Sequence, residues 1–516
     1  MKNQKPKIRR HNWISKVLKK IGTIRYIFLV YVLFTVVMSL LLFWNISHRE
    51  GVEVGYLDAL FTAASAFSDT GLNTFTNGIG ATFNEFGQAI IAICIVVGGI
   101  GIFTIKVYIF QSLLGWRTNI FNSQVSQTER GGNTISETKK MIKVSISFLI
   151  IATIFASIIF TLYFYYNDNQ FFTDNVDKLN GTGLKPYEFN PYVPLQYKPY
   201  NNINLAIKYG VFHAISSINN AGFDIISAKS LQPYYYDYGF QIITIFVFLI
   251  GGIGFPVIYD FWLKIQSLDK DKKAHRFSLF TKFTLITYIS TTAIALILTI
   301  IFETTARGEM YFWNQQAYGN SWNKLFAIYF QVKSTRSAGF STINYYNFTQ
   351  PTIIIHGILM FIGFSPVSTA GGVRNTTIAV IFLSIITMVS GKKHINAFKR
   401  QIGKETLIKA VNVFTIALLL VTTGTLVVYA TLPHTSETPW QTSLPLTFVF
   451  FEICSAFGNS GLSTGVTGQI QVVGKLAIIL VMITGQFGIP QTIKIWGKSK
   501  ASSENYQYIY EDVSIG

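Results

Sequence analysis

The chain has 516 residues, of which 50% are hydrophobic and only 13% are charged, and its mean hydropathy is +0.38. This composition is too apolar for a water-soluble protein of that length. The formal net charge of +18 would suggest nucleic-acid binding in a soluble chain. Here the basic residues lie between apolar stretches, as in membrane proteins, so no nucleic acid is expected as a partner.

Several stretches carry no charge over about 20 positions, the length that a helix needs to cross the hydrocarbon core. In chain order they are 26–46, 86–105, 144–167, 239–259, 283–302, 410–436 and 476–493. A further apolar span, 351–390, is interrupted. The sequence therefore predicts a polytopic membrane protein, and Cys94 and Cys454, each inside an apolar stretch, are interpreted as packed thiols.

The basic residues predict the topology. The tail over residues 1–25 is rich in Lys and Arg and has no acid. Further basic clusters follow at 117–143, 264–282, 392–409 and 494–500. Such segments stay cytoplasmic, so we expect a cell-membrane protein with both termini in the cytoplasm. The first apolar span is too long to be the core of a cleavable signal peptide.

A short glycine pattern occurs four times between the apolar spans. The four runs are SDTGLNT at 68–74, NNAGFDI at 219–225, RSAGFST at 336–342 and GNSGLST at 458–464. Each places a small residue before a glycine, and Leu or Phe with a polar residue after it. The glycines are Gly71, Gly222, Gly339 and Gly461.

Around each glycine the chain repeats one unit: a long apolar helix, a shorter half-apolar segment, the glycine run and a second apolar helix. The short segments, 57–67, 205–218, 322–335 and 444–457, have re-entrant length. The predicted units are repeat 1 at 26–116, repeat 2 at 141–264, repeat 3 at 278–391 with a broken second helix, and repeat 4 at 405–498, followed by a cytoplasmic tail at 499–516. The predicted fold class is an all-α polytopic membrane protein with four pseudo-symmetric helix–pore loop–helix repeats around a central cation path.

Backbone that leaves a helix at membrane depth survives only when it is buried in protein or lines a watery cavity. Four glycine breaks could line one path, where backbone carbonyls replace the hydration shell of a monovalent cation. An ordinary glycine turn between helices is the alternative for any single copy. The candidate filter residues, whose carbonyls would hold the cation as the only metal ion, are Asp69, Thr70, Gly71, Asn220, Ala221, Gly222, Ser337, Ala338, Gly339, Asn459, Ser460 and Gly461.

Three segments carry a family resemblance: SINNAGFD at 217–224, TRSAGFST at 335–342 and GFSPVSTAGGVRNTT at 363–377. With them the chain resembles the Trk/Ktr/HKT superfamily of potassium transporters, most closely the bacterial Ktr/Trk membrane subunits. The resemblance implies potassium uptake, and Gly71 favours potassium because sodium-preferring plant relatives often carry Ser there. It also implies a homodimer, a separate ring of cytoplasmic nucleotide-binding regulatory subunits, and no covalent cofactor.

Charged residues near the runs have support roles in this interpretation. Lys333 and Arg336 are expected behind the filter, paired with groups such as Glu452, because a lone buried charge is costly. Asp69 is interpreted as a support. Asp224 either attracts cations at the outer mouth or supports its loop through hydrogen bonds.

The run 363–377 interrupts the second helix of repeat 3. The resemblance implies an intramembrane gate loop below the filter, and a kinked transmembrane helix is the alternative. Its gate residues are Ser365, Pro366, Ser368, Thr369, Gly371, Gly372 and Arg374. In repeat 4, Gln486 stands in the pore below the filter where relatives usually have Arg, which predicts a more weakly gated path.

Other functions fit less well. A cation-coupled secondary transporter, driven by Na⁺ or H⁺, and a less selective channel for Na⁺ and K⁺ both remain open. No enzyme is predicted, because His213 and His356 lack acidic or Cys neighbours at ligand spacing and are interpreted as packed or polar-network histidines.

Overall fold

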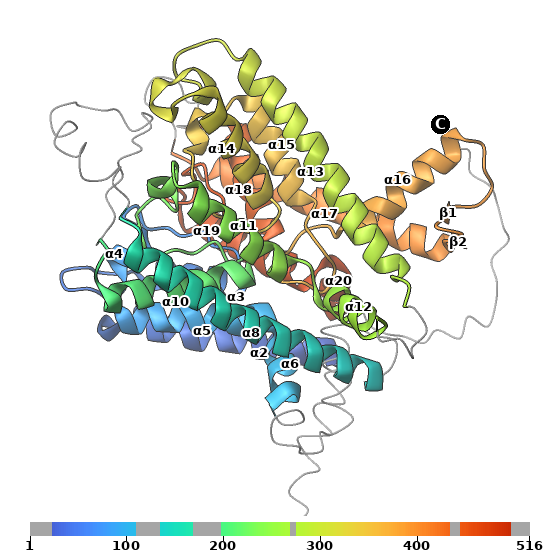
Figure 1. Ribbon diagram of the computed structural model, residues 1–516, viewed down its shortest axis with the longest axis horizontal. Coiled ribbons are helices and arrows are strands. Elements are labelled where there is room, and N and C mark those ends of the chain that lie inside the picture. The colour runs from blue at the N-terminus through green and yellow to red at the C-terminus, as the bar shows by residue number, and fades with distance from the viewer. Residues whose placement is uncertain (1–22, 110–134, 169–197, 269–274, 434–443, 497–516) are drawn as a thin grey trace, which may run out of the picture.

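The computed structural model describes residues 23–109, 135–168, 198–268, 275–433 and 444–496, and the description below is of these residues (Figure 1). Most of the predicted tail at 1–25 and all of the tail at 499–516 lie outside them. The described chain is helical apart from one short hairpin, β1 (Asn396–Ala397) with β2 (Arg400–Gln401), in which Asn396 pairs with Gln401.

Four long helices form the outside of the molecule: α2 (Thr23–Phe43), α8 (Ile135–Tyr166), α13 (Leu279–Thr305) and α17 (Lys404–Ala430). By length and apolar composition these four can cross a membrane. Large apolar side chains point outward from them, among them Leu33 at 64% exposed and Ile151 at 66%. Such a surface is stable against lipid and confirms the multi-pass membrane class.

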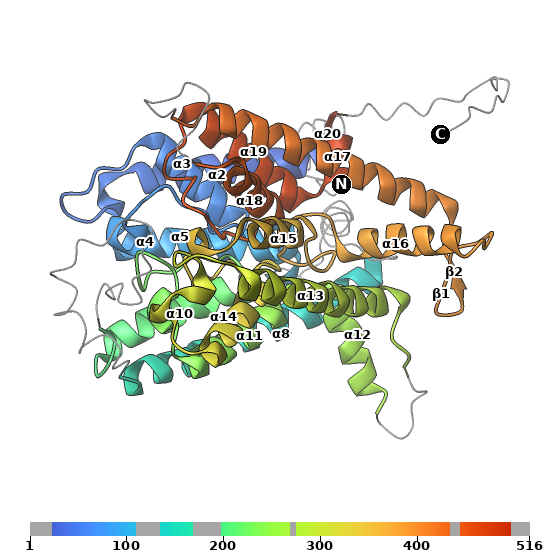
Figure 2. The same cartoon turned by 90° about the horizontal axis from the view of Figure 1, so that it is seen from above.

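Four short helices lie inside the ring of long ones, and we call them the pore helices: α3 (Tyr56–Phe67), α10 (Ile203–Asn219), α14 (Ser321–Ser334) and α18 (Leu446–Gly458). They match the predicted short segments to within two residues at each end. Side-chain caps start two of them, since Asn202 accepts from the Leu205 N–H and Asn320 from the Asn323 N–H. In Figure 2 the pore helices surround the middle of the molecule.

The second helix of each unit, here the inner helix, is divided into two pieces. The pairs are α5 (Glu85–Ile100) with α6 (Ile102–Val107), α11 (Tyr238–Gly252) with α12 (Phe255–Gln266), α15 (Gln350–Phe361) with α16 (Asn375–Val389), and α19 (Val472–Phe487) with α20 (Ile489–Trp496). The sequence predicted a break only in repeat 3, so its continuous spans at 86–105, 239–259 and 476–493 are wrong. Gly101, Gly254 and Gly488 stand at the other three breaks with φ of +83°, +90° and +80°.

A glycine with a positive φ can end an α-helix without any polar residue nearby. A hydropathy profile therefore does not reveal these helix breaks. The bend at the second break is large, since α11 and α12 meet at 96°. If that bent pair is counted as one span, the described helices that can cross a membrane become five. Short connecting elements complete the fold: α4 (Gly78–Thr82), η1 (Asn45–Ser47), η4 (Gln232–Tyr234), η5 (Phe312–Asn314), η6 (Gln316–Tyr318) and η7 (Tyr345–Asn347).

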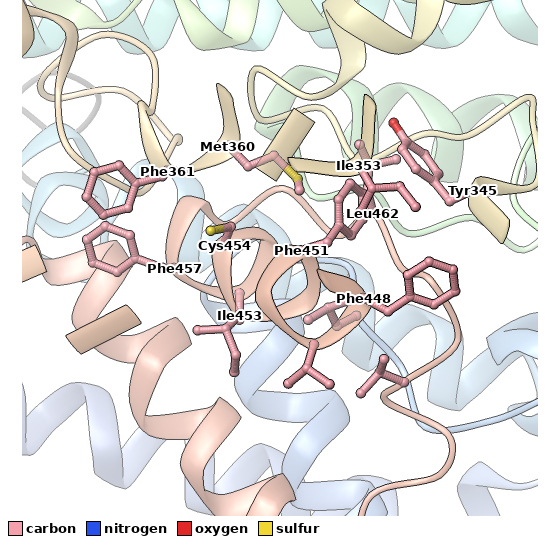
Figure 3. Close-up of a cluster of buried hydrophobic side chains, with 14 of the residues drawn as sticks. Tyr345, Ile353, Met360, Phe361, Phe448, Phe451, Ile453, Cys454, Phe457 and Leu462 are labelled. Atoms are coloured by element: carbon pink, nitrogen blue, oxygen red, sulfur yellow. The ribbon is translucent and has the colours of Figure 1, made fainter. Parts of the chain in front are cut away.

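The apolar core is centred on the pore helices. In Figure 3, Phe457 of α18 lies against Phe361 of α15, with ring centroids 5.6 Å apart. Cys454 lies in the same cluster, and both it and Cys94 are buried free thiols, as predicted. Burial of such large aromatic and aliphatic side chains fixes where each pore helix ends.

The first and last units of the chain meet, so that the four units close into a ring. The Arg25 Nε donates to the carbonyl of Ile495 at 2.8 Å, and the rings of Tyr31 and Phe487 lie 5.0 Å apart. The start of α2 and the end of α20 are therefore neighbours. The hairpin and α16 project at one end of the molecule, opposite to α4 (Figures 1 and 2).

Candidate functional site

The four glycines of the repeated pattern lie together at the centre of the molecule. Their φ angles are +88° at Gly71, +66° at Gly222, +76° at Gly339 and +83° at Gly461. Every one is in the left-handed region that a residue with a side chain rarely adopts. We call these four residues the glycine ring.

Contacts around the glycine ring run in one direction and close on themselves. A Cβ on Gly71 would overlap the carbonyl oxygen of Ala221, and one on Gly222 would lie 3.2 Å from that of Ala338. A Cβ on Gly339 would overlap the Ser460 oxygen, and one on Gly461 the Thr70 oxygen. The residue before each glycine thus presents its carbonyl to the neighbouring unit, and no side chain fits between them.

The residue two places before each glycine also has a positive φ: +53° at Asp69, +55° at Asn220, +120° at Ser337 and +50° at Asn459. Asn220 and Asn459 are the left-handed C-caps of α10 and α18. Asn and Asp tolerate this conformation better than other non-glycine residues. The sequence reasoning placed these residues in the filter but missed the cap, although the Asn and Asp side chains were a signal for it.

A cavity of about 640 Å³ opens on one side of the glycine ring and is lined by all four glycines. Asn73, Asp224, Ser341 and Ser463, each two residues beyond a glycine, also line it. The Asp224 Oδ1 accepts from the N–H groups of Ile226 and Ser227, at 3.2 Å each. Burial raises the pKa of this carboxyl to about 6, against the lowering effect of these hydrogen bonds. Both readings of Asp224 from the sequence are therefore compatible with its place.

On the other side of the ring lies the segment 362–374, which has no helical structure. It is bound from two directions. The Gly371 and Gly372 N–H groups donate to the carbonyls of Gly458 at 3.1 Å and Phe457 at 2.9 Å, at the end of α18. On the other flank the Phe255 N–H of α12 donates to the Val367 carbonyl at 3.4 Å. The run is thus a loop and not a kinked helix.

Polar side chains hold this loop beneath the ring. Asn220 Nδ2 donates to Thr369 Oγ1 at 3.1 Å, which joins the loop to a filter residue. Ser368 Oγ donates to the Ser365 carbonyl at 2.7 Å, and Ser365 Oγ to that of Pro366 at 3.1 Å. Arg374, the residue before α16, donates to the carbonyls of Ala370 and Gly371. The backbone groups freed by the helix break are satisfied in this way, as membrane depth demands.

The predicted pairing of Arg336 or Lys333 with Glu452 is wrong. Within the described residues neither cation forms an ion pair with that carboxylate. Glu452 is fully buried and accepts from Ser463 Oγ at 2.7 Å, from the Thr464 N–H at 3.0 Å and from the Thr467 N–H at 3.2 Å. These neutral donors from the loop after Gly461 satisfy the carboxylate, so it needs no cation.

Arg336 is bound instead by uncharged acceptors at the two ends of the loop 362–374. Its Nη2 donates to the Gly363 carbonyl at 3.1 Å and to Asn375 Oδ1 at 2.7 Å, and its carbon Cζ lies 5.4 Å from the centroid of the Tyr288 ring. The ammonium of Lys333 lies 5.1 Å from the same ring. Carbonyl and aromatic partners carry no formal charge, so a search of the sequence for opposite charges does not find them. The predicted pairing with Glu452 failed for this reason.

The other three units share a close contact between the inner helix and the pore helix. In the other three units a glycine of the inner helix lies directly on a carbonyl near the end of its pore helix: Gly98 on Phe67, Gly251 on Ile218, and Gly485 on Phe457. A Cβ would overlap the carbonyl in each case. In the sequence the runs GGIGIF at 98–103, GGIGFP at 251–256 and GQFGIP at 485–490 supported the repeat and left the local role of these glycines open. Close packing is their role here.

Gln486 and Asp69 complete the surroundings of the ring. The side-chain amide of Gln486 lies 3.3 Å from Asn459 Nδ2 and 3.4 Å from the Gly98 carbonyl oxygen. It therefore lies at the base of the ring, between the first and last units. Asp69 is fully buried, and its carboxylate would lie 3.0 Å from a Cβ on Gly99. This site behind the ring agrees with a support role.

The two histidines lie in polar contacts within the bundle. His213 Nε2 is 3.2 Å from Thr244 Oγ1, and His356 Nε2 is 3.1 Å from Thr299 Oγ1. Among the described residues no group of three or more His, Cys, Asp or Glu side chains could hold a metal ion.

Comparison with known proteins gives consistent matches over nearly the whole chain. Residues 35–500 match the profile of the family described as TrkH, cation transport protein. An uncharacterized cation transporter of Mycoplasma genitalium is 33% identical over 91% of this chain and 89% of its own length. The Ktr system potassium uptake protein D of Bacillus subtilis is 31% identical over 97% of this chain and 99% of its own length.

A solved structure has the same fold. The potassium transporter TrkH from Vibrio parahaemolyticus aligns with a TM-score of 0.62 at 16% sequence identity, covering 95% of this chain and 87% of that one. At this identity the likeness concerns the fold alone. It confirms the predicted helical membrane architecture.

Proposed function

The chain belongs to the TrkH family of cation transport proteins, and on that premise we propose that it takes up potassium across the cell membrane through the glycine ring. Membership makes it a multi-pass membrane cation transporter and not an enzyme. The identity of the ion, its path and the gate are the parts of this proposal that go beyond family membership.

The observation that carries the proposal is the closed sequence of contacts in the glycine ring. The carbonyls of Thr70, Ala221, Ala338 and Ser460 each approach the next glycine around the ring. Four inward carbonyl oxygens can replace the water shell of a monovalent cation. The twelve predicted filter residues, Asp69–Gly71, Asn220–Gly222, Ser337–Gly339 and Asn459–Gly461, form this ring and its caps, and their carbonyls are the proposed K⁺ ligands.

The cavity beside the ring serves as the outer mouth in this proposal, with Asp224 attracting cations. The loop 362–374 serves as the gate. Because hydrogen bonds hold it on both α18 and α12, opening requires that at least one of these flanks separates. Arg336, bound at both ends of the loop, links such a movement to the third filter segment.

We propose further that the chain acts as a homodimer with a cytoplasmic ring of nucleotide-binding subunits, and that both termini are cytoplasmic. The relative from Bacillus subtilis is named as part of a Ktr system, which supports a multi-component assembly. Nucleotide would act through that separate subunit.

Uptake of K⁺ and Na⁺ into liposomes that hold only this chain tests the path. Gly71→Ser places a Cβ on the carbonyl of Ala221 at a φ of +88°, so we expect lower K⁺ uptake and a shift toward Na⁺. Gly465→Ser is the matched control, because Gly465 has a φ of +89° but nothing within 4 Å of an added Cβ. Equal selectivity in the wild type and Gly71→Ser would contradict the proposal.

The same assay separates the alternatives. A cation-coupled transporter would accumulate K⁺ only with a Na⁺ or H⁺ gradient, whereas a channel-like path follows the K⁺ gradient and the membrane potential. A weakly selective channel would carry both ions at similar rates in the wild type. Selective K⁺ flux that follows the K⁺ gradient and needs no Na⁺ or H⁺ gradient is the result that the glycine ring predicts.

A further inference from the structure

Four polar contacts join neighbouring units near the outer mouth, and we call them the collar. We propose that the contact at the junction of the last and first units sets the geometry of the glycine ring. In this collar the ion pair of Asp58 with Lys475 is the specificity-determining contact, although neither side chain touches the ion. The inference rests on the proposed potassium function and names positioning residues for it.

Each contact of the collar joins the beginning of a pore helix to the beginning of the inner helix of the preceding unit. Asp58 of α3 binds Lys475 of α19 at 2.5 Å, and Lys208 of α10 binds Glu85 of α5 at 3.3 Å. Asn323 of α14 accepts from the Tyr238 hydroxyl of α11 at 2.7 Å. Thr447 of α18 donates to Gln350 of α15. The same place is thus bridged at all four junctions by four different side-chain pairs.

A pore helix is a short rigid rod with a collar residue in its first two turns and the glycine run at its other end. It is too short to cross the bilayer, so lipid thickness does not fix its height or tilt. A sideways shift at its beginning moves the carbonyl at its end. Selectivity between K⁺ and Na⁺ depends on the arrangement of those carbonyls, so the collar acts on it from a distance.

The junction between the last and first units differs from the other three. Units 1 to 2, 2 to 3 and 3 to 4 are connected by the chain itself, whereas unit 4 meets unit 1 through side-chain and backbone contacts alone. At the outer level that contact is Asp58 with Lys475, at the ring it is Asn459 with the Ser68 carbonyl, and at the far end Arg25 with Ile495. Loss of the contact between Asp58 and Lys475 should therefore loosen the glycine ring more than loss of a collar contact at any other junction.

Exposure also separates the two ion pairs of the collar. The side chains of Lys475 and Asp58 are 17% and 26% exposed, whereas Glu85, the partner of Lys208, is 86% exposed. Ion pairs at an exposed surface contribute little because water screens them and both side chains lose freedom. The pair of Lys208 and Glu85 has the same chemistry and the same place in its unit, and it supplies the matched control.

The test compares K⁺ and Na⁺ uptake in liposomes for wild type, Asp58→Asn, Lys475→Gln and the exchanged pair Asp58→Lys with Lys475→Asp. We expect the ratio of K⁺ to Na⁺ uptake to fall about fivefold in each single variant and to recover by more than half in the exchanged pair. Glu85→Gln and Lys208→Gln should keep the ratio within about twofold of wild type. Size-exclusion profiles and thermal unfolding verify that the variants compared are folded, and Lys475→Gln alone breaks the ion pair in the comparison if Asp58→Asn does not fold.

Unchanged ratios in folded Asp58→Asn and Lys475→Gln would overturn the inference. A folded exchanged pair that stays unselective, or an equal loss in the Glu85 and Lys208 variants, would overturn it as well, since the ion pair at the closing junction would then have no special role. A wild type that carries neither ion would overturn the proposed function itself. A selective wild type with insensitive variants overturns the collar alone.

Discussion

Gln486 is part-buried beside the proposed path, and its neutral side chain makes this place easy to test. It contacts Asn459 and the Gly98 carbonyl at the base of the glycine ring. Gln486→Arg would put a full positive charge there. At ~8 Å from a passing cation and an effective dielectric constant of ~20, the repulsion is about 2 kcal/mol, or roughly a thirtyfold lower rate of K⁺ uptake.

The change in uptake must come from the charge at that place and not from a disturbed helix. Gln486→Asn keeps the site neutral and should stay near the wild-type rate. Gln471→Arg adds the same charge at the exposed start of α19 and should have little effect on uptake. Unaltered K⁺ flux in folded Gln486→Arg would show that the path does not pass this residue.

Asp224 should make uptake depend on the pH of the outer solution. Burial raises the pKa of its carboxyl to about 6, so the carboxylate is present above that pH and is lost as the pH falls through it. If the carboxylate attracts cations to the mouth, uptake at low K⁺ concentration should decrease about two- to fivefold between pH 7.5 and pH 5. Asp224→Asn should remove most of this dependence.

The control for Asp224 is an exposed acid in the connection that follows α13. Glu309→Gln removes a charge of the same sign and should keep the wild-type pH profile. Ionisation of Asp224 also changes the stability of the folded protein. Because the pKa in the folded protein is raised, ionisation above pH 6 destabilises the loop, and Asp224→Asn should increase thermal stability at pH 8 but not at pH 4. A flat wild-type uptake profile would assign Asp224 to loop support alone.

At the scale of elements, the loop 362–374 should open more readily when its link to the ring is cut. Thr369→Val keeps the size of the side chain but removes the hydroxyl that accepts from Asn220 Nδ2. One such hydrogen bond contributes about 1 kcal/mol, so K⁺ uptake should rise roughly fivefold if this contact stabilises the closed state. Thr376→Val makes the same change in α16 and should leave uptake unchanged. A lower rate in Thr369→Val would mean that the loop assists passage.

The elements differ in how well the sequence predicted them. The pore helices were predictable because a polar glycine run follows the end of each helix and a half-apolar segment precedes each run. Breaks at Gly101, Gly254 and Gly488 were not, although the motif around them is visible, because an apolar run continues through each break. Close packing and a left-handed turn both favour glycine, and only the backbone angle separates these two roles.

The candidate site likewise contains residues that the sequence predicted and contacts that it did not. Positions in the glycine ring followed from a local pattern that recurs in the chain. The partners of Arg336 and Glu452 did not, because they depend on which segments the fold brings together. Each charge has several neutral donors or acceptors, and half of these belong to the backbone, which every residue type supplies.

At the scale of the whole molecule, the topology can be tested with single cysteines, since both native ones are fully buried. The β1–β2 hairpin lies beside the start of α13, where the rings of Phe283 and Phe398 are 5.8 Å apart. Glu309 follows the other end of that long helix. If α13 crosses the membrane, Arg400 and Glu309 must face opposite sides.

The basic residues around it predict that the hairpin faces the cytoplasm. In intact cells a membrane-impermeant thiol reagent should label Glu309→Cys and leave Arg400→Cys unlabelled until the membrane is permeabilised. The wild type, with Cys94 and Cys454 in the core, should stay unlabelled throughout. Because Arg25 and Ile495 are hydrogen-bonded to each other, these two residues lie on the same side of the membrane. The reverse labelling would place them outside and turn the Asp224 cavity toward the cytoplasm, so the pH dependence predicted for the outer solution would have to appear with the inner one.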